Sequence, residues 1–546
     1  MADRRTDPID AAAADYGWAS LRPGQREAIE LVLDGRDVLA VMPTGHGKSA
    51  IYQLAARLID GTTIVVSPLI ALQRDQVEQL DELGDDGAVA VNSSQRVGEN
   101  RAAWEELEAG EAEFVFLAPE QLARDEVVER LRELQPSLIV VDEAHCVSAW
   151  GHDFRPDYLR LGHVIEALGH PTTIALTATA APPVRDEIVE RLRMRDARQV
   201  VHGFDRPNIF LEVHREHDDD SRRAAIVERV VAEQKPGLVY VATRKETQRL
   251  VDDLRAAGVR AEAYHAGMAR AERDRVHEAF SDGSAEAVVA TSAFGMGIDK
   301  ADVRFVLHAA PPDSPDSYYQ EIGRAGRDGE PALAALYFRQ EDFGLHRFRT
   351  GGSADTEMLS RVASRVRRAK RPVPPARLRE RLEVGASRLT AAVNLLEQAG
   401  AIQTTDDGDL VWREGTVKPA VDEAERLADA RRSVERSRGD MMRGYAETSG
   451  CRRRFLLGYF GEELDGLCGA CDTCRSGAAG RAEEERAEGD RVDGDWPVGA
   501  EVHHEVWGDG SVVSDDGDRI TVLFDEAGYK TLALEVVADS DVLQRR

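Results

Sequence analysis

Short runs of consecutive apolar residues recur through the first 345 residues, and longer amphipathic stretches separate them. Such runs predict strands that are buried on both faces, as in parallel sheets covered by helices. The predicted strands are residues 38–42, 63–67, 114–118, 138–142 and 173–177 in one series, and 238–242, 287–291, 305–309 and 333–338 in another. Two series predict two α/β lobes, and the Gly- and Pro-containing segment 202–208 predicts their boundary.

The pattern changes in the C-terminal half. Residues 365–381 are strongly basic, and a helix with Leu389, Val393 and Leu396 on one face is predicted after them. A hairpin centred on an Asp-Gly turn is predicted at 402–413. Helices followed by a short hairpin indicate a winged-helix-like module, and its basic run makes it a candidate for duplex DNA. The alternative for that run is a solvated helix face.

The predicted organisation has six parts. They are a first lobe (1–201), a second lobe (202–350), the winged-helix-like module (355–416), a helical cysteine-containing subdomain (419–476), an acidic flexible linker (477–495) and a small β-barrel (496–546). The barrel is predicted from four strand-like runs that glycines and Asp-Gly turns separate.

Composition narrows the function classes. The net charge of −29 argues against binding nucleic acid by bulk attraction, although local basic surface remains available. No run of 18 apolar residues occurs, and the first residues lack an apolar signal core, so we expect no membrane contact. Five cysteines are too few for a disulfide scaffold, so a cytoplasmic location is expected.

Residues 42–49, MPTGHGKS, carry the first candidate chemistry. Glycines let backbone N–H groups close on phosphate oxygens, and the following helix points its positive end at them. A lysine then contacts the outer phosphates, and a serine hydroxyl can bind Mg²⁺. The predicted nucleotide-binding residues of this segment are Thr44, Gly45, Gly47, Lys48 and Ser49. The alternative is an ordinary strand–helix turn.

Two carboxylates follow the apolar run LIVV at 138–141. Ligands bind at the carboxyl ends of strands in open parallel sheets, so Asp142 is a predicted Mg²⁺ ligand and Glu143 a base that orients the attacking water. A solvated helix face is the alternative for a lone DEAH tetrapeptide. Charge builds on the phosphoryl oxygens in the transition state, so Arg324 and Arg327 in QEIGRAGRDG are the candidate catalytic guanidinium groups.

Four of the five cysteines form the pattern C-x16-C-x2-C-x2-C. Four thiolates suit tetrahedral Zn²⁺, and a closed shell of this kind is structural rather than catalytic. The predicted ligands are Cys451, Cys468, Cys471 and Cys474. The alternatives are reduced structural thiols and an iron–sulfur cluster.

Taken together, these motifs resemble superfamily 2 helicases and, within them, the RecQ family of ATP-dependent DNA helicases. The similar segments are residues 18–25, 42–49, 65–77, 142–158, 176–180, 264–268, 290–308 and 317–329, together with the cysteine cluster. The resemblance implies two tandem RecA-like lobes. It departs from the family at His46, where the family usually has Gly.

Further site residues are implied only by this resemblance. Gln25 would read the adenine edge while Trp18 and Arg22 sandwich the ring, with core packing as the alternative for Trp18. The remaining residues would sense nucleotide in the cleft between the lobes or couple ATP to the strand groove; the sensing residues are Gly297, Asp299 and Gln320, and the coupling residues are Thr177 and Thr179.

The segment after DEAH resembles the family's aromatic-rich loop. Aromatic faces stack on bases without sequence preference, and a loop next to Asp142 could report bound DNA to the hydrolytic site. The predicted DNA-binding and coupling residues are Trp150, His152, Phe154 and Arg155. The alternative is a loop that packs on its own lobe.

The C-terminal half departs from the family order, in which the zinc subdomain directly follows the second lobe. Residues 498–532 instead resemble the Tudor-like tail barrel of UvrD/PcrA-type helicases. This resemblance implies a protein partner such as RNA polymerase or a repair factor. With the acidic linker before it, we expect the barrel to be a docking appendage whose deletion leaves unwinding intact.

The expected function is 3′→5′ ATP-dependent translocation on single-stranded DNA with duplex unwinding in repair or recombination, in the nucleoid-associated cytoplasm. One alternative is an RNA-dependent ATPase on the same lobes. Another is an ATP-gated DNA-binding or remodelling factor without processive unwinding, which the unusual C-terminal half favours.

Overall fold

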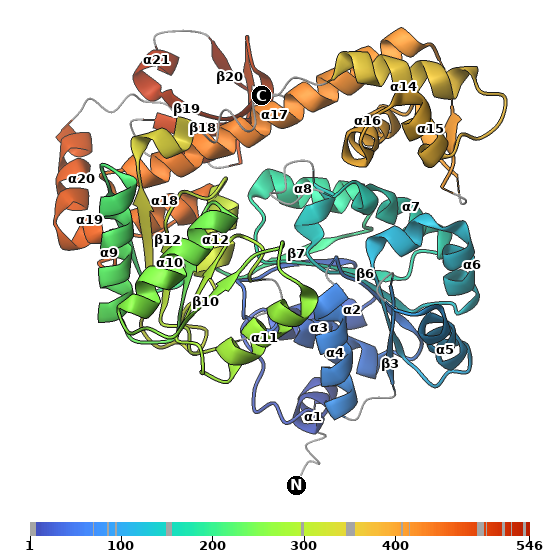
Figure 1. The fold of residues 1–546 in the computed structure, drawn as a ribbon, viewed down its shortest axis with the longest axis horizontal. Coiled ribbons are helices and arrows are strands. Elements are labelled where there is room, and N and C mark those ends of the chain that lie inside the picture. The colour runs from blue at the N-terminus through green and yellow to red at the C-terminus, as the bar shows by residue number, and fades with distance from the viewer. Residues whose placement is uncertain are drawn as a thin grey trace.

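A computed structural model describes most of the 546 residues. The described residues are 7–68, 70–83, 87–92, 95–148, 155–295, 300–344, 355–405, 408–413, 415–488, 496–497, 499–515, 519–525, 527–538 and 542–546. Two α/β lobes lie side by side, and a long helix crosses above both of them (Figure 1). No helix among the described residues is long and apolar enough to cross a membrane.

The first lobe is a seven-stranded parallel sheet in the order β3-β4-β2-β5-β6-β1-β7. Its strands are β1 (Val38–Val41), β2 (Thr63–Val66), β3 (Ala88–Val91), β4 (Phe114–Leu117), β5 (Leu138–Val141), β6 (Thr172–Thr177) and β7 (Arg198–Val201). Its helices are α1 (Pro8–Asp15), α2 (Gln25–Leu33), α3 (Ser49–Leu58), α4 (Ile70–Leu83), α5 (Val97–Glu108), α6 (Asp125–Glu133), α7 (Leu161–Ala167) and α8 (Pro182–Arg191). Short 3₁₀ turns cover Pro119–Ala123, Ala144–Val147 and Pro156–Arg160.

The second lobe is a six-stranded parallel sheet in the order β10-β11-β9-β12-β13-β8. Its strands are β8 (Ile209–Arg215), β9 (Gly237–Tyr240), β10 (Ala261–Tyr264), β11 (Ala287–Ala290), β12 (Phe305–His308) and β13 (Ala332–Phe338). Its helices are α9 (Asp219–Ala232), α10 (Arg244–Ala256), α11 (Arg270–Ser281) and α12 (Pro315–Ile322). All nine strands predicted from apolar runs are present. The strands β3, β7, β8 and β10 were not predicted.

The inserted module has the predicted helices and hairpin. It contains α14 (Thr356–Arg368), α15 (Pro375–Leu382), α16 (Ala386–Gln398) and the antiparallel pair β14 (Ile402–Thr404) and β15 (Leu410–Trp412). Leu389, Val393 and Leu396 are buried in its core, as the helical spacing predicts. An ion pair from Glu397 to Arg160 ties the module to the first lobe.

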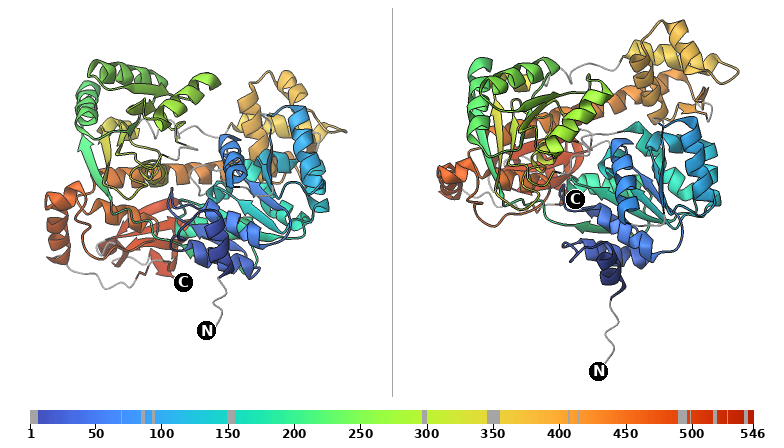
Figure 2. Two further views of the ribbon diagram at one scale, coloured as in Figure 1. Left: turned by 90° about the horizontal axis from the view of Figure 1, so that it is seen from below. Right: turned by 60° about the horizontal axis from the view of Figure 1, so that its bottom comes forward.

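Helix α17 (Val417–Glu447) has 31 residues and connects this module to the cysteine cluster (Figures 1 and 2). Its first turns pack in the core of the inserted module, where Val421 and Ala424 are buried. Its last turns pack on the second lobe, where Tyr445 contacts Tyr318 of α12 at a ring distance of 5.0 Å. Helices α18 (Arg452–Tyr459) and α19 (Asp472–Arg475) follow.

The predicted flexible linker is only partly a linker. Residues Ala478–Glu488 form helix α20, in which Ala479 is fully buried, and Glu483 pairs with Arg454 of α18. Small and charged residues are compatible with a helix when one face finds a partner, which composition alone does not reveal. Residues 489–495 lie outside the described part of the chain.

The tail, residues 496–546, forms an antiparallel sheet in the order β19-β18-β17-β16-β20. Its elements are β16 (Glu501–His504), β17 (Gly508–Asp515), β18 (Arg519–Phe524), β19 (Gly528–Ala533), helix α21 (Leu534–Ala538) and β20 (Leu543–Arg545). We call this unit the tail domain. The last of the four predicted strand-like runs covers residues 530–537, and only its first half is a strand because α21 takes its second half. Far from being detached, β19 packs along α17.

The core of the inserted module provides a test of its independence from the lobes. Leu396→Ala removes a fully buried side chain, and we expect a loss of about 2–5 kcal/mol in the module's unfolding free energy. Native-state hydrogen exchange should then quicken in α14 and α16 but not in the lobe strands. The exposed Thr390→Ala on the same helix is the control. Equal quickening in both lobes would contradict an independent module.

Candidate nucleotide and metal sites

The loop between β1 and α3 has the backbone that a phosphate cradle requires. Gly45 and Gly47 both have φ of +77°, a region that side-chain-bearing residues rarely adopt. Helix α3 begins at Ser49, so its free N–H groups face the loop. The Lys48 ammonium lies under the loop and donates to the carbonyl of Met42 at 3.2 Å. The loop therefore offers donors and a cation together.

Residues 21–25, LRPGQ, form hydrogen bonds with this loop. The buried Gln25 side chain donates from Nε2 to the carbonyls of His46 and Gly47 at 3.0 and 2.8 Å. Arg22 donates from its guanidinium to the carbonyl of Gly45. Trp18 is half-buried, lies 5.1 Å from the Tyr16 ring and packs against the first lobe's core. Trp18 thus has the core contacts that its alternative interpretation predicts, while Arg22 and Gln25 lie at the nucleotide loop.

Asp142 and Glu143 follow β5, beside the same loop. The Asp142 carboxylate accepts from the Glu143 backbone at 3.0 Å, and Glu143 takes a left-handed φ of +48°. Burial and the neighbouring Glu143 charge raise the pKa of Asp142 to about 7, against the opposing effect of Lys48. The Ser49 hydroxyl accepts from Gln76 at 3.4 Å. Carboxylate and hydroxyl oxygens are ligands that suit Mg²⁺.

The two candidate arginines of the second lobe behave differently. Arg327 lies on Gly45 of the first lobe, where a Cβ built on the glycine would be 2.8 Å from Arg327 Cδ. Arg324 instead donates to the carbonyl of Gly295 and is buried within the second lobe. Gln320 is half-buried on α12, just before both arginines. Gly297 and Asp299 lie outside the described residues.

A series of buried polar contacts joins the carboxylates to residues 176–180, LTATA. His145 Nδ1 lies 3.0 Å from the Thr177 hydroxyl and 3.4 Å from the Glu143 carboxylate. The Thr177 hydroxyl donates to the carbonyl of Thr179 at 3.1 Å. The structure therefore brings both predicted coupling threonines close to Glu143, the predicted base. His145 was missed as a site residue, although its place in DEAH could have singled it out.

The aromatic-rich loop is described only at its end. Trp150, His152 and Phe154 lie outside the described residues. Arg155 donates from its backbone to the carbonyl of Cys146 at 3.0 Å and from its guanidinium to the carbonyl of Pro68 at 3.2 Å. This end of the loop is thereby fixed to the segment that follows β2.

One positioning residue was not foreseen. Arg206, in the segment between the lobes, donates to the carbonyls of Gly323, Ala325 and Gly326 at 3.1, 2.8 and 2.9 Å. These carbonyls flank Arg324 and precede Arg327, so the interlobe segment holds the arginine-bearing turn. No sequence spacing links Arg206 to residues more than a hundred positions later.

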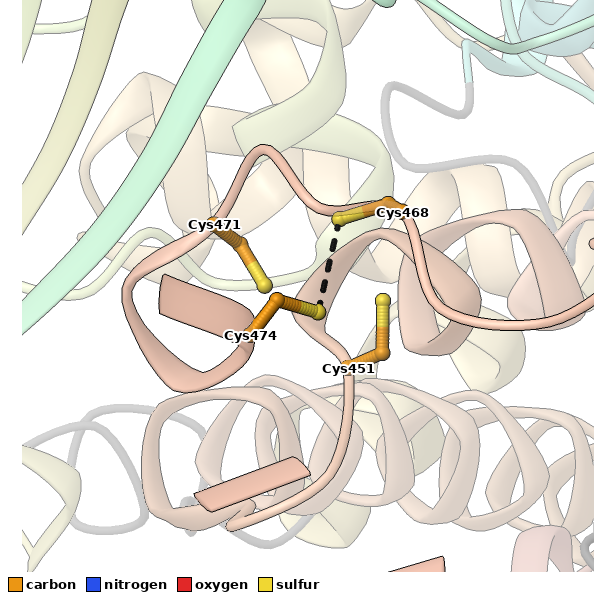
Figure 3. A group of neighbouring side chains, drawn as sticks. All are labelled: Cys451, Cys468, Cys471 and Cys474. Carbon is orange, nitrogen blue, oxygen red and sulfur yellow. Dashed lines mark hydrogen bonds between the residues drawn. The ribbon is translucent and has the colours of Figure 1, made fainter. Parts of the chain in front are cut away.

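The four cysteine side chains lie close together (Figure 3). Cys451 directly precedes α18, and the other three lie within or just before α19. Their sulfur atoms all lie within 4.8 Å of one another, and those of Cys468 and Cys474 are 3.8 Å apart. Four convergent thiols match a tetrahedral zinc shell with no open position. The adjacent backbone also joins the second lobe, since Leu211 donates to the carbonyl of Ala470 at 3.3 Å. The residues present therefore fit structural Zn²⁺.

The arginines beside this cluster contact protein groups. Arg452 donates to Asp472 at 2.5 Å, Arg453 donates to the carbonyl of Ile209 at 2.7 Å, and Arg454 donates to the carbonyl of Gly466 at 2.6 Å. In the structure they support the cluster and its attachment to β8.

Three protein families match this chain. The DEAD/DEAH box helicase family matches residues 22–188, the helicase conserved C-terminal domain matches 222–329, and the RecQ zinc-binding family matches 416–475. These three segments fall on the first lobe, the second lobe and the cysteine-bearing helices described above.

The curated relatives to which the chain is similar are named as DNA helicases, in agreement with these family matches. The RecQ helicase of Haemophilus influenzae is 34% identical over 84% of this chain and 62% of its own length. The RecQ helicase of Bacillus subtilis is 42% identical over 61% of this chain and 56% of its own length. The probable helicase RecS of Bacillus subtilis is 39% identical over 60% of this chain and 66% of its own length. The chain thus spans less than two thirds of these relatives.

Solved structures share the fold. Mycobacterium smegmatis Lhr bound to ssDNA and AMP-PNP has a TM-score of 0.51 at 20% identity, covering 95% of this chain and 79% of that one. MrfA bound to DNA has a TM-score of 0.53 at 18% identity, covering 77% of this chain and 64% of that one. With both helicase lobes and the RecQ zinc-binding segment matched, this chain belongs to the RecQ family of DEAD/DEAH box helicases.

Proposed function

We propose that this protein is an ATP-dependent DNA helicase that translocates 3′→5′ on a single strand and unwinds duplex DNA in repair or recombination. The observation that carries the proposal is the contact of Arg327 with Gly45, which joins the second lobe to the phosphate loop of the first. A hydrolytic site made from both lobes makes each turnover depend on their relative position. Chemistry is thereby coupled to motion.

The described residues divide the hydrolytic work. Thr44, Gly45 and Gly47 would cradle the phosphates, and Lys48 would contact the outer ones. Glu143 would orient the attacking water, and Arg327 would stabilise the charge that develops on the transferring group. Bound Mg²⁺, held by Ser49 and Asp142, would neutralise phosphate charge. Arg324, bonded to Gly295, would act by fixing that backbone rather than by touching ATP.

Strand contact is assigned to the aromatic-rich loop. Trp150, His152 and Phe154 would stack on bases at about 1–3 kcal/mol each. Support comes from Arg155, which fixes the end of the loop on the segment after β2. The His145, Thr177 and Thr179 chain would relay strand occupancy to Glu143. Gly297, Asp299 and Gln320 keep their proposed role in sensing nucleotide.

The inserted module favours a second contact, with duplex DNA. Eight cationic side chains between Arg365 and Arg381 are all exposed. Within the described chain none of the eight takes part in an ion pair, although the protein carries a charge of −29. The eight are Arg365, Arg367, Arg368, Lys370, Arg371, Arg377, Arg379 and Arg381. Unpaired cations on one module provide the local attraction for phosphates that the whole chain lacks.

A protein partner remains a proposal for the tail domain. Val506 and Val536 are exposed there at 79% and 63%, as an interaction surface requires. RNA polymerase or a repair factor is the proposed partner. Because chromosomal DNA is the proposed substrate, nucleoid-associated cytoplasm is the proposed location.

Loss of the phosphate contacts tests the main proposal. Lys48→Ala and Arg327→Ala should each lower DNA-stimulated ATP hydrolysis, the latter by about 10³-fold, and both should abolish displacement of a strand from a 3′-tailed duplex. Arg101→Ala, exposed on α5, is the control. Hydrolysis that rises only with RNA would favour the RNA-dependent ATPase. Hydrolysis stimulated by DNA without strand displacement would favour the remodelling factor.

Charge removal tests the duplex contact. Changing Arg365, Arg368, Arg377 and Arg381 together to Gln should weaken duplex binding and reduce the slope of log K against log salt by about 0.9 per lost phosphate contact. Fluorescence anisotropy across a salt series measures this slope. The matched control is Arg426→Gln on α17, whose cation already pairs with Glu423. An unchanged slope would leave the eight side chains as a solvated face.

Metal content tests the cysteine cluster. The purified chain should hold one Zn²⁺, and Cys471→Ser should release it because a three-thiolate site binds far more weakly. Elemental analysis measures the metal, and hydrogen exchange of α18 and α19 should quicken on its loss. Cys146→Ala, buried in the first lobe outside the cluster, should keep the zinc. Iron in place of zinc would support the iron–sulfur alternative.

A further inference from the structure

The tail domain meets α17 with almost no space between their backbones. A Cβ on Gly528 would lie 2.3 Å from the Ser437 hydroxyl and 3.1 Å from Val434 Cα. The Ser433 hydroxyl also donates to the carbonyl of Ala527 at 3.0 Å. Only glycine fits such a contact, and Gly528 has φ of +73° as well. The contact fixes the tail domain at one position on the helix.

Beside this contact, one aromatic side chain of the tail domain packs against α18. Tyr529 is 4% exposed and stacks on Tyr459 of α18, with ring centroids 5.1 Å apart and planes at 29°. Val513 and Leu523 of the tail domain share the same buried cluster. The buried Arg438 of α17 faces both tyrosines. A docking appendage needs no residue buried this deeply.

From Tyr459 the contact continues to the helix that leads to the arginines. The Tyr459 hydroxyl donates to the carboxylate of Asp316, and both residues are buried. Burial raises the pKa of Tyr459 well above its ordinary value, so the hydroxyl keeps its proton and remains a donor. Asp316 lies in the first turn of α12, which has eight residues. A helix of about 12 Å moves as one piece, so a shift at Asp316 would reach the turn that carries Arg327.

Phe460, directly after α18, contacts both the segment between the lobes and the first lobe. The rings of Phe460 and Phe204 stack with their centroids 4.5 Å apart and their planes at 9°. The ring of Tyr319, on α12, also contacts Phe460, at a centroid distance of 4.9 Å. Arg185 donates to the carbonyl of Phe460 and to that of Ala180, the last residue of LTATA, both at 2.8 Å. Helix α18 therefore lies where both lobes meet, and the tail domain packs against it.

We propose that the tail domain is a brace of the hydrolytic site, and that Tyr529 and Tyr459 are positioning residues that hold α12 so that Arg327 reaches the phosphate loop. The inference rests on the proposed hydrolytic function. It replaces the expectation of a dispensable appendage. The tail domain can still offer its exposed face to a partner, and a partner that loosens the Tyr529 contact would then lower hydrolysis.

The test uses the full chain with saturating ATP and oligodeoxynucleotide. Tyr459→Phe removes only the hydroxyl, and Tyr529→Ala removes the stacked ring. Both should lower kcat for ATP hydrolysis about five- to tenfold and leave KM for ATP within about twofold, since the groups act on the transition-state contact. Glu505→Ala, at an exposed site of the same domain, should match the wild type.

A double-mutant cycle separates positioning from general loss of structure. If Tyr459 acts through Arg327, then Tyr459→Phe should cost nothing further in an Arg327→Ala background. Independent, multiplicative losses would overturn the inference, and so would wild-type kcat in both single variants. Should Tyr529→Ala undock the domain, hydrogen exchange in β19 will show it, and Tyr459→Phe alone then decides. A wild-type chain without DNA-stimulated hydrolysis would instead refute the proposed function.

Discussion

The proposed hydrolytic site depends on one contact across the two lobes. The Arg327 side chain lies against Gly45, and the glycine is needed both for its positive φ and for the absence of a Cβ. An arginine placed this way can meet a developing negative charge only while the lobes are together. Arg206, Phe204 and α18 all contact the region where the lobes meet, and each helps to define the distance that this contact requires.

Much of this arrangement could be predicted from sequence because its signals are local. Buried parallel strands are short apolar runs, so nine of the thirteen lobe strands were visible as such. The phosphate loop, DEAH and the cysteine spacing each place their chemistry within a few residues, and the structure brings the cysteines within 4.8 Å of one another. Gly400, with φ of +70°, follows the end of helix α16, and a glycine in this position is a local signal of the same kind.

The remainder was hidden because it consists of contacts between distant segments. Arg206 reaches carbonyls more than a hundred residues away, and Tyr459 reaches Asp316 across a similar interval. A charged stretch such as 478–488 becomes α20 only because Ala479 and Glu483 find partners on the zinc-binding helices. Likewise, no local feature of the sequence distinguishes Arg324 from Arg327. Arg324 donates to the carbonyl of Gly295 in its own lobe, whereas Arg327 contacts Gly45 of the other lobe.

Helix α17 is long enough to convert a small rotation at one of its ends into a large displacement at the other. Its 31 residues extend for about 46 Å, with one end built into the second lobe's zinc-binding helices and the other into the basic module. A rotation of about 10° between the lobes would move the far end by about 8 Å, roughly the rise of two base pairs or more. The ion pair of Arg160 with Glu397 is partly open to solvent and would resist such a rotation only weakly. A small hinge movement at the proposed nucleotide site would thereby become a movement of the basic module by about two base-pair steps.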